Sequence, residues 1–178
     1  ADYSQECLEK AEEGFGELRE KEQTEGAKYW AAAELYKLTG KQNYLEVINQ
    51  LTEETIPIGF GEESAGYLGT LAYLTTTYKT DINLCNLMMD GFFSDAIEMI
   101  EESSKDGYKV SLKSAYAPDS DSEILQNARL LTLMNIISKS TDYVIGVENH
   151  ISYLCGRNPY EYCYVEDEVT EEADSLIF

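Results

Sequence analysis

Apolar side chains recur every three or four residues over most of the chain, which is the spacing of amphipathic helices. This spacing predicts helices over residues 3–19, 44–52, 64–78, 84–103, 123–138 and 143–155. Residues 27–38 are apolar on nearly every face, which predicts a helix packed on several sides. No alternating pattern typical of strands is found, so we predict an all-α fold.

The predicted helices end at recognisable turns. The helix over residues 143–155 runs into Gly156, Arg157, Asn158 and Pro159. Gly156 can adopt the left-handed conformation that ends a helix, and Pro159 cannot continue one. We therefore assign these four residues a structural role as a turn, with Arg157 and Asn158 holding the turn together rather than touching a ligand.

A weak internal repeat indicates how the helices are arranged. Residues 35–45 share a spacing with residues 134–144: Leu35, Leu38, Asn43, Tyr44 and Leu45 align with Met134, Ile137, Asp142, Tyr143 and Val144. Two helix-turn-helix units of the same spacing predict antiparallel helical hairpins joined by short turns. Residues 105–120, which contain glycine and proline, are predicted to form an ordered loop.

Composition narrows the classes of partner. The 178 residues suffice for one domain with a core, and 43% of them are apolar. The net charge of −21 argues against nucleic acid and anionic membranes, because both require a basic surface. The sequence contains no uninterrupted apolar run of about eighteen residues, so we predict no membrane-spanning helix. We predict one helical domain over residues 1–165 and an acidic tail or linker over 166–178; a neutral polysaccharide and a divalent cation remain compatible.

The cysteines and the single histidine give no strong chemical signal. Cys7, Cys85, Cys155 and Cys163 match no zinc-binding spacing. The first three fall inside helical patterns, where a free cysteine acts as a small buried apolar residue, although a disulfide stays open. His150 lies at the border of an apolar stripe, which favours a hydrogen-bonded structural histidine over a catalytic one.

Four segments of the chain share features with a known family. They are residues 29–45, which begin YWAAAELYKLTGK; GYKVSL at 107–112; SDSEILQNA at 120–128; and YLCGRNP at 153–159 with Tyr164-Val165. Together they resemble the cellulases of glycoside hydrolase family nine. The last segment is similar to the family's Tyr-Leu-Leu-Gly-Arg-Asn-Pro and Ser-Tyr-Val motifs. The resemblance covers residues 5–165, in the order and with the gaps that the family shows.

The resemblance implies a fold and a function. The fold is part of an α/α toroid of helical hairpins, with an open cleft for a β-1,4-glucan at one end, in an extracellular protein. The family cleaves with inversion, which requires two carboxylates about 6.5–9.5 Å apart. The family's Asp-Ala-Gly-Asp base motif and its His-His-Arg segment are absent from this sequence, and the chain stops before the region of the acid. No catalytic residue is therefore assigned.

Loop residues are the best candidates for ligand contact. Tyr116, Tyr160, Tyr162 and Tyr164 are predicted to lie in loops, where tyrosine rings can stack on sugars, whereas tyrosines at helical spacing belong to the core. Asp119, Asp121 and Glu123 faintly suggest a calcium site. Because this spacing lacks the glycine and the distant glutamate of an EF-hand, capping of the next helix by Ser120, Asp121 or Ser122 is the preferred interpretation.

Three functions fit these observations. The chain is part of a secreted polysaccharide-degrading hydrolase whose catalytic groups lie elsewhere, with the remaining hairpins as its partner. Alternatively, it is a degenerate, non-catalytic module for carbohydrate binding or protein assembly. The third hypothesis is an unrelated helical-repeat interaction protein.

Overall fold

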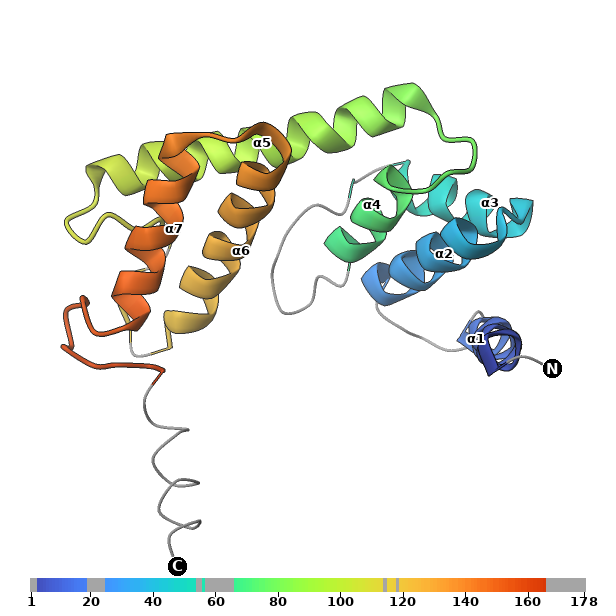
Figure 1. Ribbon diagram of the computed structural model, residues 1–178, viewed down its shortest axis with the longest axis horizontal. Helices are drawn as coiled ribbons and strands as arrows, with labels where there is room; N and C mark the ends of the chain where they lie inside the picture. Colours follow the sequence, from blue (N-terminus) through green and yellow to red (C-terminus); the bar gives the residue numbers. More distant parts are fainter. Residues whose placement is uncertain are drawn as a thin grey trace, which may run out of the picture. The chain divides into compact units, whose positions relative to one another are not determined.

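A computed structural model describes residues 3–18, 25–53, 56, 66–113, 115–117 and 119–165. Seven α-helices and one isolated β-bridge make up the secondary structure of these residues (Figure 1). The helices are α1 (Tyr3–Leu18), α2 (Glu25–Thr39), α3 (Gln42–Thr52), α4 (Gly66–Leu74), α5 (Ile82–Lys105), α6 (Asp121–Ser138) and α7 (Thr141–Leu154). The prediction of an all-α fold is confirmed.

The predicted helices agree with the observed ones to within two residues at most ends, and α4 is the exception. It ends at Leu74 instead of Tyr78. The hydroxyl of Thr75 donates to the carbonyl of Leu71 at 2.6 Å, and that of Thr76 accepts from the N–H of Tyr78 at 3.2 Å. Threonine hydroxyls that bind nearby backbone groups in this way compete with helix continuation. Ser64, the predicted cap, and residues 166–178, the predicted tail, lie outside the described residues.

The chain forms two compact units, residues 1–91 and 92–178, with the boundary inside α5. In the first unit α2 packs against α1, α3 and α4. The Tyr29 hydroxyl lies 3.1 Å from that of Thr70, and the rings of Tyr36 and Tyr73 stack at 6.5 Å. The later residue of α2, Tyr36, contacts the later residue of α4, Tyr73, so α2 and α4 run in the same direction. Helix α3 returns antiparallel to α2 (Figure 1).

The second unit contains the second part of α5, α6, α7 and the loops that carry the candidate site. Helices α6 and α7 lie side by side and antiparallel, joined by Lys139 and Ser140 (Figure 1). A Cβ at Gly146 would come within 2.8 Å of Leu131 and 3.0 Å of Ile100, so α7 approaches both neighbouring helices closely at this position. Ser140 caps α7, because its hydroxyl accepts the N–H of Asp142 at 3.2 Å.

The two hairpins α2–α3 and α6–α7 end their first helix in the same way. Gly40 and Lys139 occupy equivalent positions in the sequence repeat, and both have left-handed backbone angles, φ 66° and φ 44°. Tyr44 and Tyr143, also equivalent, are both buried at the start of the second helix. The shared spacing therefore reflects a shared turn, although only one of the two turns has the glycine that this conformation favours.

In the part of the chain that the structure describes, we find no helix that combines the length and apolar character needed to cross a membrane.

Candidate functional site

The turn that follows α7 is built around the side chain of Asn158, which is almost fully buried. Its Nδ2 donates to the carbonyls of Tyr153 at 2.8 Å and Tyr162 at 2.7 Å. Its Oδ1 accepts the N–H groups of Tyr160 at 3.0 Å and Tyr162 at 3.3 Å. All four bonds hold backbone groups, so Asn158 fixes the path of the segment that carries the candidate tyrosines.

Arg157 ties the same turn to the rest of the second unit. Its Nη2 donates to the carbonyl of Tyr108 at 3.1 Å and to the Asn149 side chain at 2.8 Å. Gly156 before it has φ 107°, a conformation that favours glycine. Arg157 therefore joins α7, the turn and the loop after α5.

Three of the four tyrosines predicted for ligand contact surround one hollow of about 540 Å³, together with Asp121. Tyr160 and Tyr162 are 45% and 44% exposed, and the rings of Tyr162 and Tyr164 meet edge to face with centroids 5.0 Å apart. The volume lies within the range of small-molecule sites, about 300–1,000 Å³. Residues that are distant from Asp121 in sequence are thus gathered beside the start of α6.

One side of the hollow is acidic, because Asp121 lines it beside the three tyrosines. Burial raises the pKa of the Tyr164 hydroxyl, and the carboxylates of Asp121 and Asp119 raise it further. The Tyr164 hydroxyl therefore stays neutral and can donate or accept hydrogen bonds. An uncharged ligand with both apolar faces and hydroxyl groups suits such a surface better than an anion does.

Tyr116, the fourth predicted tyrosine, does not line the hollow. Its ring stacks on that of Tyr153 with centroids 5.9 Å apart, and its hydroxyl donates to the Asp106 carboxylate. Its carbonyl accepts the hydroxyl of Tyr160 at 3.0 Å. Tyr116 therefore supports the tyrosine that does line the hollow, and direct ligand contact by Tyr116 stays a prediction.

Asp106 anchors this supporting layer from the end of α5. Its carboxylate also accepts the N–H groups of Tyr108 at 2.8 Å and Val110 at 3.3 Å. Burial alone would raise the pKa of Asp106, but the hydrogen bond from Tyr116 and those from the backbone outweigh it and lower the pKa. Burial raises the pKa of Tyr153 to about 12, and its hydroxyl has no hydrogen-bond partner among the described residues.

A second network, missed in the sequence, holds the loop after α5. The N–H of Ser111 donates to Nε2 of His150 at 3.1 Å, its carbonyl accepts Nδ2 of Asn127 at 2.7 Å, and its hydroxyl donates to Glu102 at 2.5 Å. Nδ1 of His150 lies 2.7 Å from the carbonyl of Gly146. His150 is thus buried and hydrogen-bonded. The sequence predicted an ordered loop here and a hydrogen-bonded His150, but not which groups His150 and Ser111 would contact.

The acidic residues near the start of α6 have separate contacts. Glu123 accepts the N–H of Lys113 at 2.7 Å, whereas Asp121 faces the tyrosine hollow. Within the described ranges no group of three His, Cys, Asp or Glu side chains could hold a metal ion. The predicted cap is wrong for Ser120, which occupies the N-cap position without a capping bond; its hydroxyl accepts the N–H of Ala117 at 3.0 Å instead.

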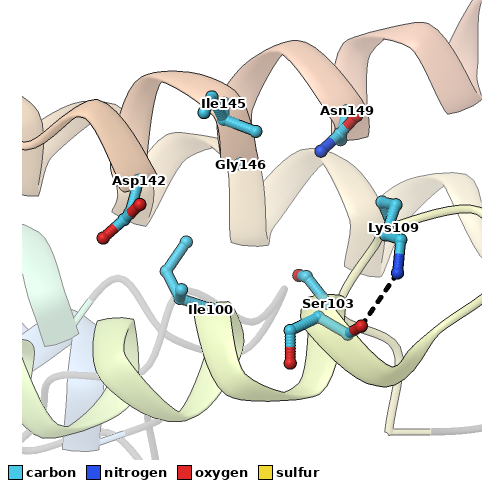
Figure 2. A pocket seen from close by; sticks show the side chains of 8 residues that line it. Ile100, Ser103, Lys109, Asp142, Ile145, Gly146 and Asn149 are labelled. Carbon is cyan, nitrogen blue, oxygen red and sulfur yellow. Dashed lines mark hydrogen bonds between the residues drawn. The ribbon is translucent and has the colours of Figure 1, made fainter.

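A smaller hollow of about 150 Å³ lies between α5 and α7 and is lined by Asp142, Asn149 and Lys109 among others (Figure 2). Two of its polar groups bind within the protein: Lys109 donates to the carbonyl of Ser104 at 2.8 Å, and Asn149 accepts from Arg157. Its volume is below the usual range for ligand sites. The tyrosine hollow is therefore the better candidate.

The cysteines differ from the prediction of small buried residues. Cys7 and Cys155 are exposed, because α1 turns Cys7 outward and α7 ends just before Cys155. Cys85 is half-buried and packs against the core of the first unit, so it is the cysteine that comes nearest to the prediction. Cys163 is half-buried and pairs with Cys155 in the isolated antiparallel bridge.

Comparison with known proteins gives a consistent result. The model of glycosyl hydrolase family 9 matches residues 1–171. Endoglucanase D of Acetivibrio thermocellus is 27% identical over 140 residues, which are 76% of this chain and 22% of that protein. Cellodextrinase of Butyrivibrio fibrisolvens is 23% identical over 152 residues, 78% of this chain and 28% of that protein. The chain thus spans about a quarter of the length of these relatives.

A structural comparison agrees on the fold. The crystal structure of a metagenome-derived glycoside hydrolase family 9 endoglucanase superposes with a TM-score of 0.69 at 20% identity, covering 82% of this chain and 27% of that one. The described helices are therefore antiparallel hairpins that form part of an α/α toroid, as the resemblance implied.

Proposed function

This chain belongs to glycosyl hydrolase family 9, and we propose that it is part of a protein that degrades a β-1,4-glucan, contributing substrate binding rather than the catalytic carboxylates. The family assignment supports a polysaccharide-degrading hydrolase of the cellulase type. Two relatives carry the names endoglucanase and cellodextrinase. Because the chain spans about a quarter of their length, activity and substrate remain proposals for this chain. An extracellular location is part of the same proposal.

The observation that carries the proposal is the hollow lined by Tyr160, Tyr162, Tyr164 and Asp121. Half-exposed tyrosine rings offer flat apolar faces to the C–H groups of a glucose ring, and their hydroxyls offer hydrogen bonds. Asp121 can accept hydrogen bonds from sugar hydroxyls. The hydrogen bonds of Asn158 fix the backbone that carries this surface, which reduces the entropic cost of binding.

The absence of turnover is proposed from the sequence. No Asp-Ala-Gly-Asp segment occurs in the chain. Among the described residues that line the hollow, Asp121 is the one carboxylate. Inversion needs two carboxylates about 6.5–9.5 Å apart on opposite sides of a glycosidic bond, one with a raised pKa.

Two measurements test the proposal. Isothermal titration calorimetry with cellohexaose is expected to give saturable binding, and a flat titration at the highest soluble ligand concentration would contradict the sugar-binding role. Hydrolysis of carboxymethylcellulose is expected to stay at the background rate. Activity that disappears on changing a single carboxylate, such as Asp121→Asn, would contradict the non-catalytic role while leaving the family assignment intact.

A second role, in assembly with other hairpins, is favoured by the apolar surface of α6 and α7. Ile136 is 71% exposed, Val144 is also exposed, and both line one hollow beside the turn between α6 and α7. Exposed apolar clusters of this kind mark contact surfaces. The partner we propose is a further set of family 9 hairpins, and the chain alone is then expected to self-associate. Light scattering that shows a monodisperse monomer over a wide concentration range would contradict this second role.

A further inference from the structure

Two cysteines lie opposite each other at the base of the tyrosine-bearing turn. Cys155 follows the last residue of α7, and Cys163 follows the turn, with seven residues between them. The two residues form the isolated antiparallel bridge, and next to it the N–H of Tyr164 donates to the carbonyl of Leu154 at 2.9 Å. Leu154 precedes Cys155 and Tyr164 follows Cys163, so this hydrogen bond flanks the two cysteines instead of joining them. Such a bond is typical of a non-hydrogen-bonded pair in an antiparallel sheet.

From this geometry we propose that Cys155 and Cys163 form a disulfide that closes the turn covalently. In a non-hydrogen-bonded antiparallel pair the Cα atoms are about 4.5 Å apart and the side chains project to the same side. A disulfide requires Cα atoms about 4.4–6.8 Å apart. The bridge therefore indicates a backbone separation close to the one that the bond needs, and we infer that rotation of the two side chains can bring the sulfurs together. This inference does not depend on sugar binding.

The turn holds the two thiols in this arrangement before any bond forms. Asn158 fixes the intervening segment through its contacts with Tyr153, Tyr160 and Tyr162. Ordering a loop costs conformational entropy, which normally opposes closure of a ring. Here hydrogen bonds already order the segment, so the effective concentration of one thiol at the other is high. Cys155 is exposed and Cys163 is half-buried, so an oxidant can reach the pair.

The two positions also depart together from the family motifs. Cys155 stands where the Tyr-Leu-Leu-Gly-Arg-Asn-Pro motif has its second leucine, and Cys163 stands where the Ser-Tyr-Val motif has serine. Cys7 and Cys85 belong to the first unit, and neither takes part in a backbone pairing in the described ranges. The pair at the turn is therefore the one that the backbone arranges for cross-linking.

The reaction proceeds by thiol–disulfide exchange with a small-molecule disulfide such as oxidised glutathione. The thiolate of one cysteine attacks the glutathione disulfide, forming a mixed disulfide and releasing one reduced glutathione. The second cysteine then attacks the protein sulfur of the mixed disulfide, forming the Cys155–Cys163 bond and releasing a second reduced glutathione. Two protein thiols are oxidised, and one glutathione disulfide is reduced to two thiols.

Peptide mapping tests the proposal directly. The chain is equilibrated with excess oxidised glutathione, its remaining thiols are alkylated in acid-quenched, denaturing conditions, and it is digested with trypsin without reductant. Cleavage after Lys139 and Arg157 places the two cysteines on separate peptides, residues 140–157 and 158–178. We expect these peptides to appear linked by mass spectrometry, to separate on reduction, and to exceed any cross-link that contains Cys7 or Cys85 about tenfold.

The controls identify alternative outcomes. The Cys7→Ser, Cys85→Ser double variant is expected to retain the cross-link, and the wild-type chain is expected to migrate as a monomer on a non-reducing denaturing gel. Peptides 140–157 and 158–178 recovered singly, whether alkylated or glutathionylated, would overturn the proposal. Linkage found only in covalent dimers, or only to Cys7 or Cys85, would overturn it as well.

Discussion

The N–H of Ser111 lies 3.1 Å from Nε2 of His150, while Nδ1 of the same ring lies 2.7 Å from the carbonyl of Gly146. Nε2 can accept a hydrogen bond only when it carries no proton, so the ring is the neutral tautomer with its hydrogen on Nδ1. The loop after α5 is therefore attached to α7 through one neutral imidazole.

This arrangement predicts a loss of stability in mild acid. Burial lowers the pKa of His150 from its ordinary value of 6.5. Because the folded pKa is below the unfolded one, the unfolded state binds more protons in the interval between them, and stability falls as the pH drops below about 6.5. Urea unfolding followed by circular dichroism from pH 8 to pH 5 measures this decrease.

Two variants separate the histidine from other acid effects. His150→Ala is expected to lower the free energy of unfolding by about 3 kcal/mol at pH 7, because it leaves a cavity and an unpaired Ser111 N–H, and to remove the decrease near pH 6. Glu148→Ala, at an exposed position of α7, should keep that decrease. Asp106, whose pKa is lowered, contributes a separate loss only below its ordinary value of 3.8. A decrease of equal size in His150→Ala would contradict the assignment.

Asn158→Asp tests the turn with almost no change of shape. The second oxygen would face the carbonyls of Tyr153 and Tyr162, which now accept from Nδ2 at 2.8 Å and 2.7 Å. Two lost donations and a buried charge are expected to lower the free energy of unfolding by about 2–4 kcal/mol at pH 7, less in acid where the carboxyl is protonated. Urea denaturation measures this. Glu161→Gln changes the charge by the same amount in the opposite direction, and because Glu161 lies on the surface of the turn it should have little effect.

Lys139→Gly is expected to stabilise the second unit. Lys139 has φ 44°, a left-handed conformation that costs a non-glycine residue about 1–2 kcal/mol, and the equivalent residue of the other hairpin is Gly40. Part of this gain is offset by the greater freedom of glycine in the unfolded chain, so we expect a net increase of about 1 kcal/mol in the free energy of unfolding. Lys139→Ala removes the same charge but keeps the strain, so thermal unfolding should distinguish it from Lys139→Gly.

The sequence predicted the elements of this fold because the signals for them are local. Helical spacing located the seven helices, and Gly156 with Pro159 located the turn after α7.

The exposure of Cys155 and the network around Ser111 were not predictable in the same way. They depend on which side chains from α5, α6 and α7 meet in three dimensions, and hydrophobic spacing carries no information about such polar contacts. Tyr160, Tyr162 and Tyr164 were proposed for ligand contact because loop tyrosines stand out from core tyrosines, and that role stays a prediction. The hydrogen bond from Tyr116 to Asp106 could not be predicted from the sequence.

The candidate sugar site makes a prediction of its own. Tyr162→Ala removes a ring that is 44% exposed and lines the hollow with Tyr160 and Tyr164. Loss of one stacking face is expected to weaken cellohexaose binding about tenfold, or about 1.4 kcal/mol, as measured by calorimetry. Tyr3→Ala is the matched control, because Tyr3 is 81% exposed on α1 in the first unit and lines no part of the hollow.

The paired variants separate a lost sugar contact from general damage. Because Asn158 holds the turn through its own side chain, Tyr162→Ala should leave the free energy of unfolding within about 1 kcal/mol of the wild-type value. Equal weakening by Tyr3→Ala and Tyr162→Ala would place the binding surface elsewhere. Unchanged affinity in a combined Tyr160→Ala, Tyr162→Ala variant that folds normally would remove the hollow from the proposed function, because the remaining Tyr164 is half-buried and offers little free ring surface on its own.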